Sequence, residues 1–330
     1  MRTRISRRRA IKLTSATALG MAVPGLLRAQ GTFPSRRITL IVPFPPGGPT
    51  DVTARILAEK LSVALNQAVV VDNIGGASGN VGAQSAARAA PDGYTLFFGT
   101  GGTHGANPAL FKNPGYDPIN SFAPVAWVTT SPNLIEVNPE FPAKTLRELI
   151  DIAKANPGKF NSAAPGYGST PHMAGELFKL AAGINIVHVS YRGSGPALTD
   201  VVGGHVPIMF DGVPSSLPLV KAGKLRALAL TSLKRLPSAP DIPTVAETIP
   251  GFEADGWFAV YAPARTPQAI VSQLNRSINE VLAIPELQQR YADLGAVTVG
   301  GPPEKLRDRV ASEVKKWADV VTRTGIHVED

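Results

Sequence analysis

Three short segments of the sequence combine glycine with hydroxyl or acidic residues, a combination that suits the binding of an anion. The first loop is Pro43–Asp51, the second loop is Asp72–Gly82 and the third loop is Ala164–His172. Each leads into a segment with helical spacing, and the first N–H groups of a helix lack internal acceptors and lie at the positive end of its dipole. Because glycine lets a ligand approach the backbone closely, the natural guest is a small carboxylate.

Each loop also has a simpler interpretation, in which the glycines only shape a turn and Thr50, Asp51 and Ser169 only cap helices. For one loop alone that interpretation is the better one. Three such loops in one chain, distributed over the two lobes described below, favour a shared binding cleft. In open α/β sheets, ligands bind beyond the carboxyl ends of the strands, which is where such loops lie.

Other motifs that could do chemistry are incomplete. The glycines at 76–82 (G-x-x-G-x-x-G) are misspaced for a dinucleotide fingerprint, and 47–50 has no P-loop lysine. The segment 193–195 (G-S-G) is too short for a nucleophile elbow. His172 and Glu176 stand four apart and could be read as a metal pair, but two ligands without a third are too few. A histidine at the start of a helix more often bonds to its own loop.

The composition narrows the chemistry further. The chain has no cysteine, which excludes disulfides, zinc–thiolate sites and thiol catalysis. Paired carboxylates spaced for acid–base work are not visible either. We therefore expect a binding protein that is not an enzyme and needs no metal or organic cofactor. An exported enzyme acting on a small organic acid is the alternative.

Strand-like runs alternate with helical spacing along the chain, a pattern typical of sheets covered by helices. Strands are predicted at 37–44, 69–71, 94–98, 122–128, 133–137, 160–164, 186–189, 208–210, 225–231 and 257–262. Helices are predicted at 50–65, 81–90, 146–156, 171–182, 196–203, 215–222, 267–283 and 303–324. The segment 99–120, rich in Gly, Asn and Pro, is expected to be a loop, and 237–244, with four prolines, an extended surface segment.

The last two predicted helices have no sheet of their own, so they most economically cover the first one. This arrangement predicts two α/β lobes that the chain crosses twice. The first lobe comprises 30–131 plus 254–330, and the second comprises 132–253. We expect each lobe to be a mostly parallel sheet flanked by helices, with the ligand cleft between the lobes.

The amino-terminal segment 1–29 has the features of an export signal. A basic start at 2–12 precedes a weakly apolar run at 13–27, and Ala29 offers a small residue at a cleavage point. Ser6–Lys12 resembles a twin-arginine signal without its usual Phe, so both Tat and Sec export remain open. Removal of 1–29 takes the net charge from +8 to +1, leaving 26 basic and 25 acidic residues. The basic pI therefore belongs to this segment and gives no reason to expect that the mature protein binds nucleic acid or a membrane surface.

The loops and their flanks are similar to the Bug (TctC-like) family of extracytoplasmic solute receptors. The similarity includes R-I-x-L-I-V-P-F-x-x-G-G-x-x-D-x-x-A-R at 37–55, A-P-D-G-Y-T-L at 90–96 and G-S-x-x-H-M-x-G-E-L-F at 168–178. It continues through H-V-x-Y-R-G at 188–193 and D-I-P-T-V-A-E at 241–247. It covers essentially all of the mature chain, and the combination is specific although no single piece is.

This resemblance implies a periplasmic, two-lobed binding-protein fold of type II that closes on its ligand. Such a receptor reversibly binds a small carboxylate (an organic acid, a dicarboxylate or an amino acid) and presents it to a tripartite tricarboxylate-type transporter. Delivery of a signal to a two-component sensor kinase is the alternative. We expect a monomer whose partners are the ligand and membrane proteins.

The family's ligand site, carried onto this sequence, falls on all three loops and on two residues beyond them. Part of the contact with the carboxylate is expected through ordered waters. The implied ligand-binding residues are Phe44, Gly47, Gly48, Thr50, Asp51, Gly76, Ala77, Ser78, Gly166, Gly168, Ser169, Thr170, His172, Tyr191 and Asp211.

Three residues depart from the family pattern: Ile74 replaces a common arginine, Pro49 follows the glycine pair, and Tyr167 lies between the glycines of the third loop. The last two could narrow the cleft, or line it with an aromatic ring, and so change which acid fits. Arg192 could pair with a second carboxylate or be a surface arginine beside a turn.

Overall fold

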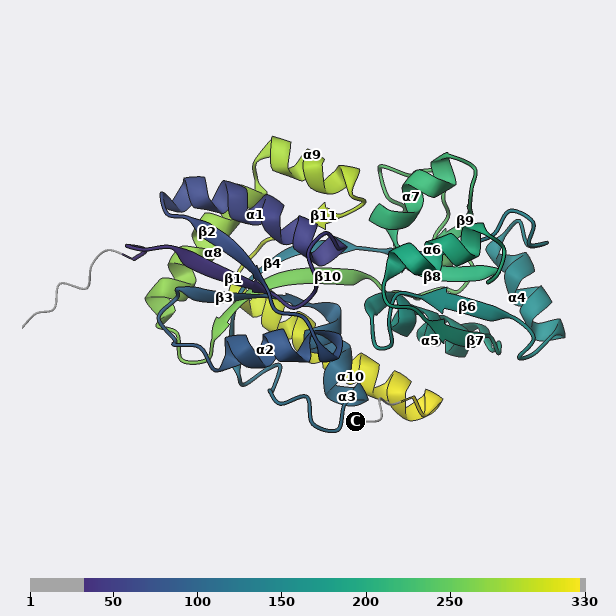
Figure 1. Ribbon diagram of the computed structural model, residues 1–330, viewed down its shortest axis with the longest axis horizontal. Helices are drawn as coiled ribbons and strands as arrows, with labels where there is room; N and C mark the ends of the chain where they lie inside the picture. Colours follow the sequence, from purple (N-terminus) through teal and green to yellow (C-terminus); the bar gives the residue numbers. More distant parts are fainter. Residues whose placement is uncertain (1–32, 327–330) are drawn as a thin grey trace, which may run out of the picture. The chain divides into compact units, whose positions relative to one another are not determined.

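Two β-sheets, each flanked by helices, make up the chain from Arg36 onward (Figure 1). The computed structural model describes residues 33–326, so the export signal expected at 1–29 lies outside the described residues. The description below concerns the unit that starts at Arg36. None of the helices in the described part of the chain combines the length and the apolar character that a bilayer crossing needs.

The first sheet has the strand order β11-β4-β10-β3-β1-β2. Its strands are β1 (Ile38–Val42), β2 (Val69–Asn73), β3 (Thr95–Thr100), β4 (Phe122–Ser131), β10 (Gly256–Pro263) and β11 (Val297–Thr298). The second sheet has the order β7-β6-β8-β5-β9. Its strands are β5 (Asn133–Val137), β6 (Asn161–Ala164), β7 (Val187–Ser190), β8 (Ile208–Gly212) and β9 (Arg226–Leu230).

Both sheets are mixed, which corrects the expectation of mostly parallel sheets. β1 pairs in parallel with β2 and β3, and β6 with β7 and β8, but β4, β5, β9, β10 and β11 all pair antiparallel. The antiparallel pairs arise where the chain passes between sheets. It leaves the first sheet through β4 and returns through β10, so these strands run side by side in opposite directions, with Gly256 opposite Ser131.

Hydrogen bonds tie the two crossings together. The side-chain amide of Asn133, which opens β5, donates to the carbonyl of Ala254 at 2.8 Å, and its backbone N–H donates to Thr231 Oγ1 at 2.8 Å. Thr231 Oγ1 in turn lies 3.1 Å from the Ala254 carbonyl. Asn133 therefore joins Thr231 and Ala254, which lie 98 and 121 positions further along the chain, in one connection between the sheets.

Most helices lie where the sequence predicts them. They are α1 (Pro49–Leu65), α2 (Asn80–Ala87), α3 (Asn107–Leu110), α4 (Leu146–Ala155), α5 (Thr170–Ala182), α6 (Ser194–Val202), α7 (Val213–Lys221), α8 (Gln268–Leu282), α9 (Pro285–Asp293) and α10 (Pro303–Thr324). Shorter turns are η1 (Ala77–Gly79), the π-type turn η2 (Gly102–Ala106) and η3 (Val245–Glu247). As predicted, Thr145 caps α4 by accepting from the N–H of Glu148.

The expectation that 99–120 is a loop was wrong, because η2 and α3 lie within it. The sequence of η2, G-T-H-G-A, has no helical pattern, and its shape depends on tertiary contacts. A Cβ atom on Gly105 would lie 3.0 Å from Trp317 Cδ1, so this glycine lets α10 approach closely. The sequence analysis also missed α9 and β11, which are short and carry few apolar residues.

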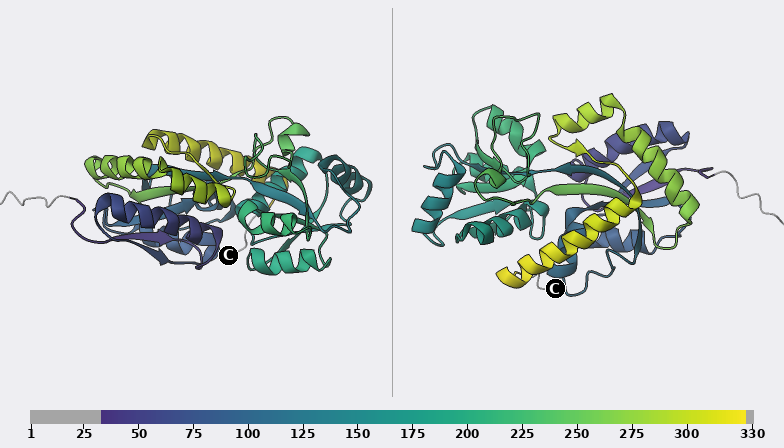
Figure 2. Two further views of the ribbon diagram at one scale, coloured as in Figure 1. Left: turned by 90° about the horizontal axis from the view of Figure 1, so that it is seen from above. Right: turned by 180° about the vertical axis from the view of Figure 1, so that it is seen from behind.

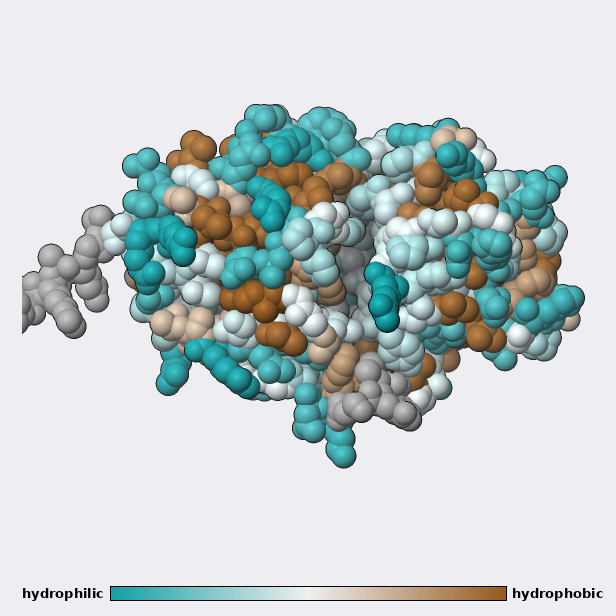
Figure 3. Space-filling view, in the orientation of Figure 1, coloured by the Kyte–Doolittle hydropathy of each residue, from teal (hydrophilic) through white to brown (hydrophobic). Residues whose placement is uncertain are grey.

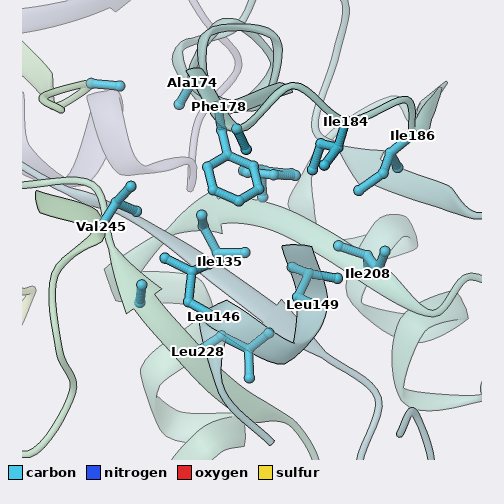
Figure 4. Close-up of a cluster of buried hydrophobic side chains, with 14 of the residues drawn as sticks. Ile135, Leu146, Leu149, Ala174, Phe178, Ile184, Ile186, Ile208, Leu228 and Val245 are labelled. Atoms are coloured by element: carbon cyan, nitrogen blue, oxygen red, sulfur yellow. The ribbon is translucent and has the colours of Figure 1, made fainter. Parts of the chain in front are cut away.

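Helix α10 contributes to the cores beneath both sheets. Leu306 and Val310 pack with Ile41 and Phe97 in the core of the first sheet. Further along, Trp317 and Val320 join the largest core cluster, which belongs mainly to the second sheet and has Ile135 and Phe178 among its members (Figure 4). Seen from behind, α10 runs from one sheet toward the other (Figure 2). The lobe limits 30–131 plus 254–330 and 132–253 therefore stay a prediction, although the two sheets are separate.

Candidate functional site

The three glycine-rich loops all lie at carboxyl ends of parallel strands. The first follows β1, the second follows β2 and the third follows β6. The space-filling surface is hollowed between the part of the molecule that carries the first sheet and the part that carries the second (Figure 3). The loops are thus in the position where open α/β sheets bind ligands.

The first loop ends in a helix start that has no side-chain cap. Gly48 is the N-cap of α1, and Pro49, at the first helical position, has no N–H. The N–H groups of Thr50 and Asp51 belong to the first turn, where no internal acceptor exists. A Cβ atom on Gly48 would meet only the Pro45 carbonyl oxygen, at 3.8 Å, so the space in front of this helix start is open.

Asp51 lies under the first loop, and other groups of the protein supply hydrogen bonds to its carboxylate. Its carboxylate accepts from Gly47 N–H at 2.9 Å, from Arg55 Nε at 3.0 Å and from Asn73 Nδ2 at 2.9 Å. Burial alone would raise the pKa of Asp51, but the hydrogen bonds from Arg55, Gly47 and Asn73 lower it below its ordinary value. The residue is only 3% exposed, so its carboxylate shapes the loop from within.

The same network joins the first loop to the second. Asn73, at the end of β2, donates from its side chain both to the Phe44 carbonyl and to Asp51, each at 2.9 Å. A Cβ atom on Gly79 would lie 3.4 Å from the ring of Phe44. The predicted residues of the first lobe therefore come together in one place, as two adjacent loops.

The second loop contains a run of left-handed backbone. Gly76, Ala77, Ser78 and Gly79 have φ values of +128°, +44°, +53° and +93°. For Ala77 and Ser78 this conformation is strained, and such strain persists only where surrounding contacts impose it. Backbone strain of this kind clusters at ligand-binding sites.

Asn107 supplies the contacts that hold this strained turn. Its side-chain amide donates to the Ser78 carbonyl at 3.0 Å and to Asn80 Oδ1 at 2.7 Å, and Tyr116 O–H donates to the same Asn80 oxygen at 3.1 Å. Asn107 begins α3, in the segment expected to be a loop. The sequence analysis missed it, because nothing local distinguishes it from the other asparagines of that segment.

The third loop uses its backbone donors internally. Gly168, with a φ of +74°, donates its N–H to His172 Nδ1 at 3.0 Å. The N-cap Ser169 accepts the N–H of His172 at 3.3 Å, and Pro171 has no N–H. His172 is therefore bonded to its own loop, as the simpler interpretation predicted. Only the Thr170 N–H of this helix start is left without a partner inside the first turn.

The third loop also contacts the first lobe directly. Ser78 Oγ donates to the Tyr167 carbonyl at 3.2 Å. A Cβ atom on Gly168 would lie 3.0 Å from Leu110 Cδ1, and one on Gly256 would lie 3.6 Å from the methyl group of Thr170. The loop thus packs against the second loop, α3 and the returning crossing.

Tyr191 and Asp211 are occupied by partners within the second lobe. Tyr191 O–H donates to Asp200 at 2.7 Å, and burial together with this carboxylate raises the pKa of Tyr191 to about 12. Asp211 is 1% exposed and accepts from Ser194 Oγ at 2.7 Å and from Ser215 Oγ at 2.5 Å. It therefore joins the first residues of α6 and α7.

A second buried carboxyl group lies close to Asp211. Ser216 Oγ donates to Glu136 Oε1 at 2.6 Å and lies 3.4 Å from Asp211 Oδ2. Burial raises the pKa of Glu136 well above its ordinary value, and the charge of Asp211 raises it further. Burial and the nearby Asp211 thus both favour the protonated form of Glu136.

Arg192 lies on the turn between β7 and α6, two residues before Ser194. It is exposed, and within the described part of the chain it forms no ion pair. Helix α6 has Gly193 as its N-cap and no side-chain cap. This turn combines an available cation with an open helix start, and the third loop has neither.

Two further observations concern a cavity away from the three loops and the capacity to bind a metal ion. A separate cavity of about 510 Å³ lies on the first lobe between Phe122, Arg265, Gln268 and Arg307, and none of the predicted ligand residues lines it. Among residues 33–326, no group of three or more histidine or acidic side chains is placed to hold a metal ion.

Comparisons with known proteins identify the family. The sequence profile of the family described as "Tripartite tricarboxylate transporter family receptor" matches residues 53–326. Protein BugT of Bordetella pertussis (strain Tohama I) is 40% identical over 312 residues, which is 94% of this chain and 94% of that protein. A protein from a tcbD-tcbE intergenic region of Pseudomonas sp. (strain P51) is 38% identical over 321 residues, 96% of this chain and 94% of that protein.

Solved structures show the same fold. An R. palustris protein with adipate has a TM-score of 0.83 and 38% identity, covering 89% of this chain and 99% of that one. MatC from Rhodopseudomonas palustris, with bound malate, has a TM-score of 0.79 and 36% identity, covering 88% and 100%. The periplasmic binding protein BugD has a TM-score of 0.80 and 38% identity, covering 90% and 100%. The predicted two-lobed binding-protein fold is confirmed.

Proposed function

Because this chain belongs to the tripartite tricarboxylate transporter family receptors, we propose that it captures a small carboxylate on the first and second loops. The observation that carries the proposal is the open, uncapped start of α1 at Gly48 beside the strained turn of the second loop. Members of the family are binding proteins, and the role of solute receptor follows for this chain. The ligand residues themselves are our proposal.

Binding at the first lobe requires donors that the protein has not already used. The N–H groups of Thr50 and Asp51 in α1, and those of Ala77 and Ser78 in η1, lie in the first turns of their helices. The dipole of α1 favours a negative charge in front of Gly48. Asp51 and Asn73 hold the two loops together from below, so the donors need little reorganisation when the ligand binds.

The second lobe would recognise the rest of the ligand. Relatives have been solved with adipate and with malate, which both carry a second carboxylate. We assign that second carboxylate to Arg192 and to the uncapped start of α6. The third loop, whose donors are used internally, would limit the length of the ligand by its position.

Export and delivery complete the proposal. Relatives are periplasmic proteins, and we place this chain in the periplasm, exported by the segment 1–29. Closure of the two lobes around the ligand would present a defined shape to a tripartite tricarboxylate-type transporter. A sensor kinase as recipient, and turnover of the acid by an exported enzyme, are the alternatives.

A binding screen tests the proposal. The chain lacking residues 1–29 is heated with malate, adipate, acetate, aspartate and benzoate, and each acid is quantified afterwards by NMR. A ligand at a hundred times its Kd stabilises the fold by about 2.7 kcal/mol and so raises the Tm. Stabilisation by at least one acid that is recovered unchanged supports the receptor. Consumption of the acid, or no stabilisation by any of them, contradicts it.

A further inference from the structure

The third loop depends on one ring nitrogen. Gly168 N–H donates to His172 Nδ1 at 3.0 Å, and the His172 side chain is almost fully buried. A nitrogen that accepts a hydrogen bond carries no proton, so the neutral ring has its proton on Nε2. This contact therefore determines the tautomer as well as the shape of the loop.

Aromatic and charged side chains surround this ring. The ring of His188, from β7, lies 4.0 Å from that of His172, and the ring of Tyr167 lies 4.5 Å away on the loop. On α5, Glu176 Oε1 is 3.6 Å from His172 Nε2, and Lys179 Nζ is 2.6 Å from the same carboxylate oxygen. Because Lys179 already neutralises Glu176, the carboxylate offers little support for a second buried cation.

The contact also controls what the loop touches. Gly168 follows Tyr167, whose carbonyl accepts from Ser78 Oγ of the second loop at 3.2 Å. The remainder of Gly168 faces α3, where Leu110 and Asn107 lie. A change at His172 Nδ1 is therefore transmitted to the strained turn at Ser78 through the backbone of Gly168 and Tyr167.

We propose that His172 is a positioning residue for the ligand site: through Nδ1 it holds the Gly168 amide, and so keeps the Tyr167 carbonyl on Ser78, without touching the ligand itself. This inference rests on the proposed function, because Ser78 belongs to the carboxylate-binding loops. It revises the expectation from the family resemblance that His172 binds the ligand.

Acid opposes this arrangement. A proton on Nδ1 would point at the Gly168 N–H, and two donors cannot share a hydrogen bond. Burial, together with the neighbouring His188 and Lys179, lowers the pKa of His172 to about 3. Because the unfolded chain binds this proton more readily, the contribution to stability is complete above pH of about 6.5 and is lost as the pH falls toward the folded pKa.

Three substitutions of His172 distinguish the effect of the hydrogen-bond acceptor at Nδ1 from the effect of the imidazole ring. In His172→Asn the amide oxygen can occupy the place of Nδ1, whereas in His172→Gln the amide lies near the place of Nε2, and His172→Leu has no acceptor. Hydrogen exchange at the Gly168 amide reports the contact without any ligand. We expect protection in the wild type and in His172→Asn, and at least tenfold faster exchange in the other two.

Affinity for malate and adipate provides the second readout. We expect His172→Asn to bind within about threefold of the wild type, and His172→Leu and His172→Gln to bind about tenfold more weakly, which corresponds to one lost hydrogen bond. Between pH 7 and pH 4.5, the free energy of unfolding should fall less in His172→Asn than in the wild type, because in this range the unfolded wild-type chain takes up a proton at His172 and an amide does not.

Several results would overturn the proposal. They are undiminished Gly168 protection in His172→Leu, equal losses in the Asn and Leu variants, or a ¹⁵N spectrum of the wild type showing the proton on Nδ1. The last measurement decides even where the Leu and Gln variants fail to fold. If the wild type binds no acid, the proposed function fails, whereas Gly168 exchange still decides the role of His172.

Discussion

The first and third loops have similar residues at their helix starts but differ in how many backbone N–H groups they leave free for a ligand. Each places a proline in the first turn of a helix and glycines before it. At α1 the N-cap is Gly48, which contributes no side-chain acceptor. At α5 the N-cap is Ser169, whose hydroxyl takes the His172 N–H, and His172 takes the Gly168 N–H. The first loop can therefore donate to a ligand, and the third is largely satisfied within itself.

The difference teaches that glycine content does not measure the capacity to bind an anion. The capacity is the number of N–H groups with no acceptor in the protein, and one cap residue changes that number. Ser169 stabilises α5 but occupies the N–H of His172, whereas Gly48 leaves the first N–H groups of α1 without an acceptor. The five predictions that follow test this contrast.

Closing the first loop should have the largest effect. Gly48→Leu places a side chain in front of α1, and we expect about a hundredfold loss of affinity for a bound acid, since charge-assisted hydrogen bonds contribute about 1.5–3 kcal/mol each. The fold should survive, because the φ of Gly48 is −79° and its Cβ position is open. Titration calorimetry measures the loss. Gly48→Ala is the graded control, and unchanged binding in Gly48→Leu would mean that the site lies elsewhere.

Removing the support beneath the first loop should come next. Asp51→Ala leaves Gly47 N–H and Asn73 Nδ2 without their acceptor, and we expect the free energy of unfolding to fall by about 1–3 kcal/mol. Asp117→Ala is a control, because Asp117 also accepts local backbone N–H groups but lies outside the loops.

The loss of stability at low pH is a second test of the Asp51 carboxylate. The pKa of Asp51 is lowered in the folded state, so its contribution is present above the unfolded pKa of about 3.9 and is lost as the pH falls through the folded value. Urea unfolding from pH 7 to pH 3 should therefore show a shallower acid decline in Asp51→Ala than in the wild type. Parallel declines would show that Asp51 is not the group responsible.

The contribution of the second lobe should be smaller and should depend on the ligand. We expect Arg192→Gln to weaken dicarboxylate binding up to about fivefold and to leave a monocarboxylate unaffected, because an exposed ion pair contributes at most about 1 kcal/mol. The difference should shrink at high salt. Arg147→Gln, an exposed arginine of α4 on the same lobe, is the control. Equal weakening of both ligand classes would remove Arg192 from the site.

The cap of the third loop provides the smallest expected effect. Ser169→Ala should cost about 1 kcal/mol of stability, as loss of an N-cap usually does. Thr145→Ala removes the equivalent cap of α4, away from the cleft, and should cost about the same. Chemical denaturation compares the two. The contrast drawn above would fail if Ser169→Ala left stability unchanged.

Much of the fold could be predicted because local patterns determine it. Apolar spacing at Ile56, Leu57 and Leu61 indicated α1, and Thr145 indicated the start of α4. Sheet direction was not predictable to the same degree, since the pairing of β4 with β10 joins residues about 130 positions apart. The π-type turn η2 was missed because its shape depends on the approach of Trp317 to Gly105.

For the site, the sequence by itself determined which segments carry glycine, caps and helix starts, because these act within about four residues of the chain. Family membership was equally visible in those segments, and the comparisons confirmed it. Only the tertiary structure decided which donors stay available. Asn107 reaches Ser78 across 29 positions and Ser78 reaches Tyr167 across 89. Hydrogen bonds over such distances depend on how the lobes fold together, and no local pattern encodes them.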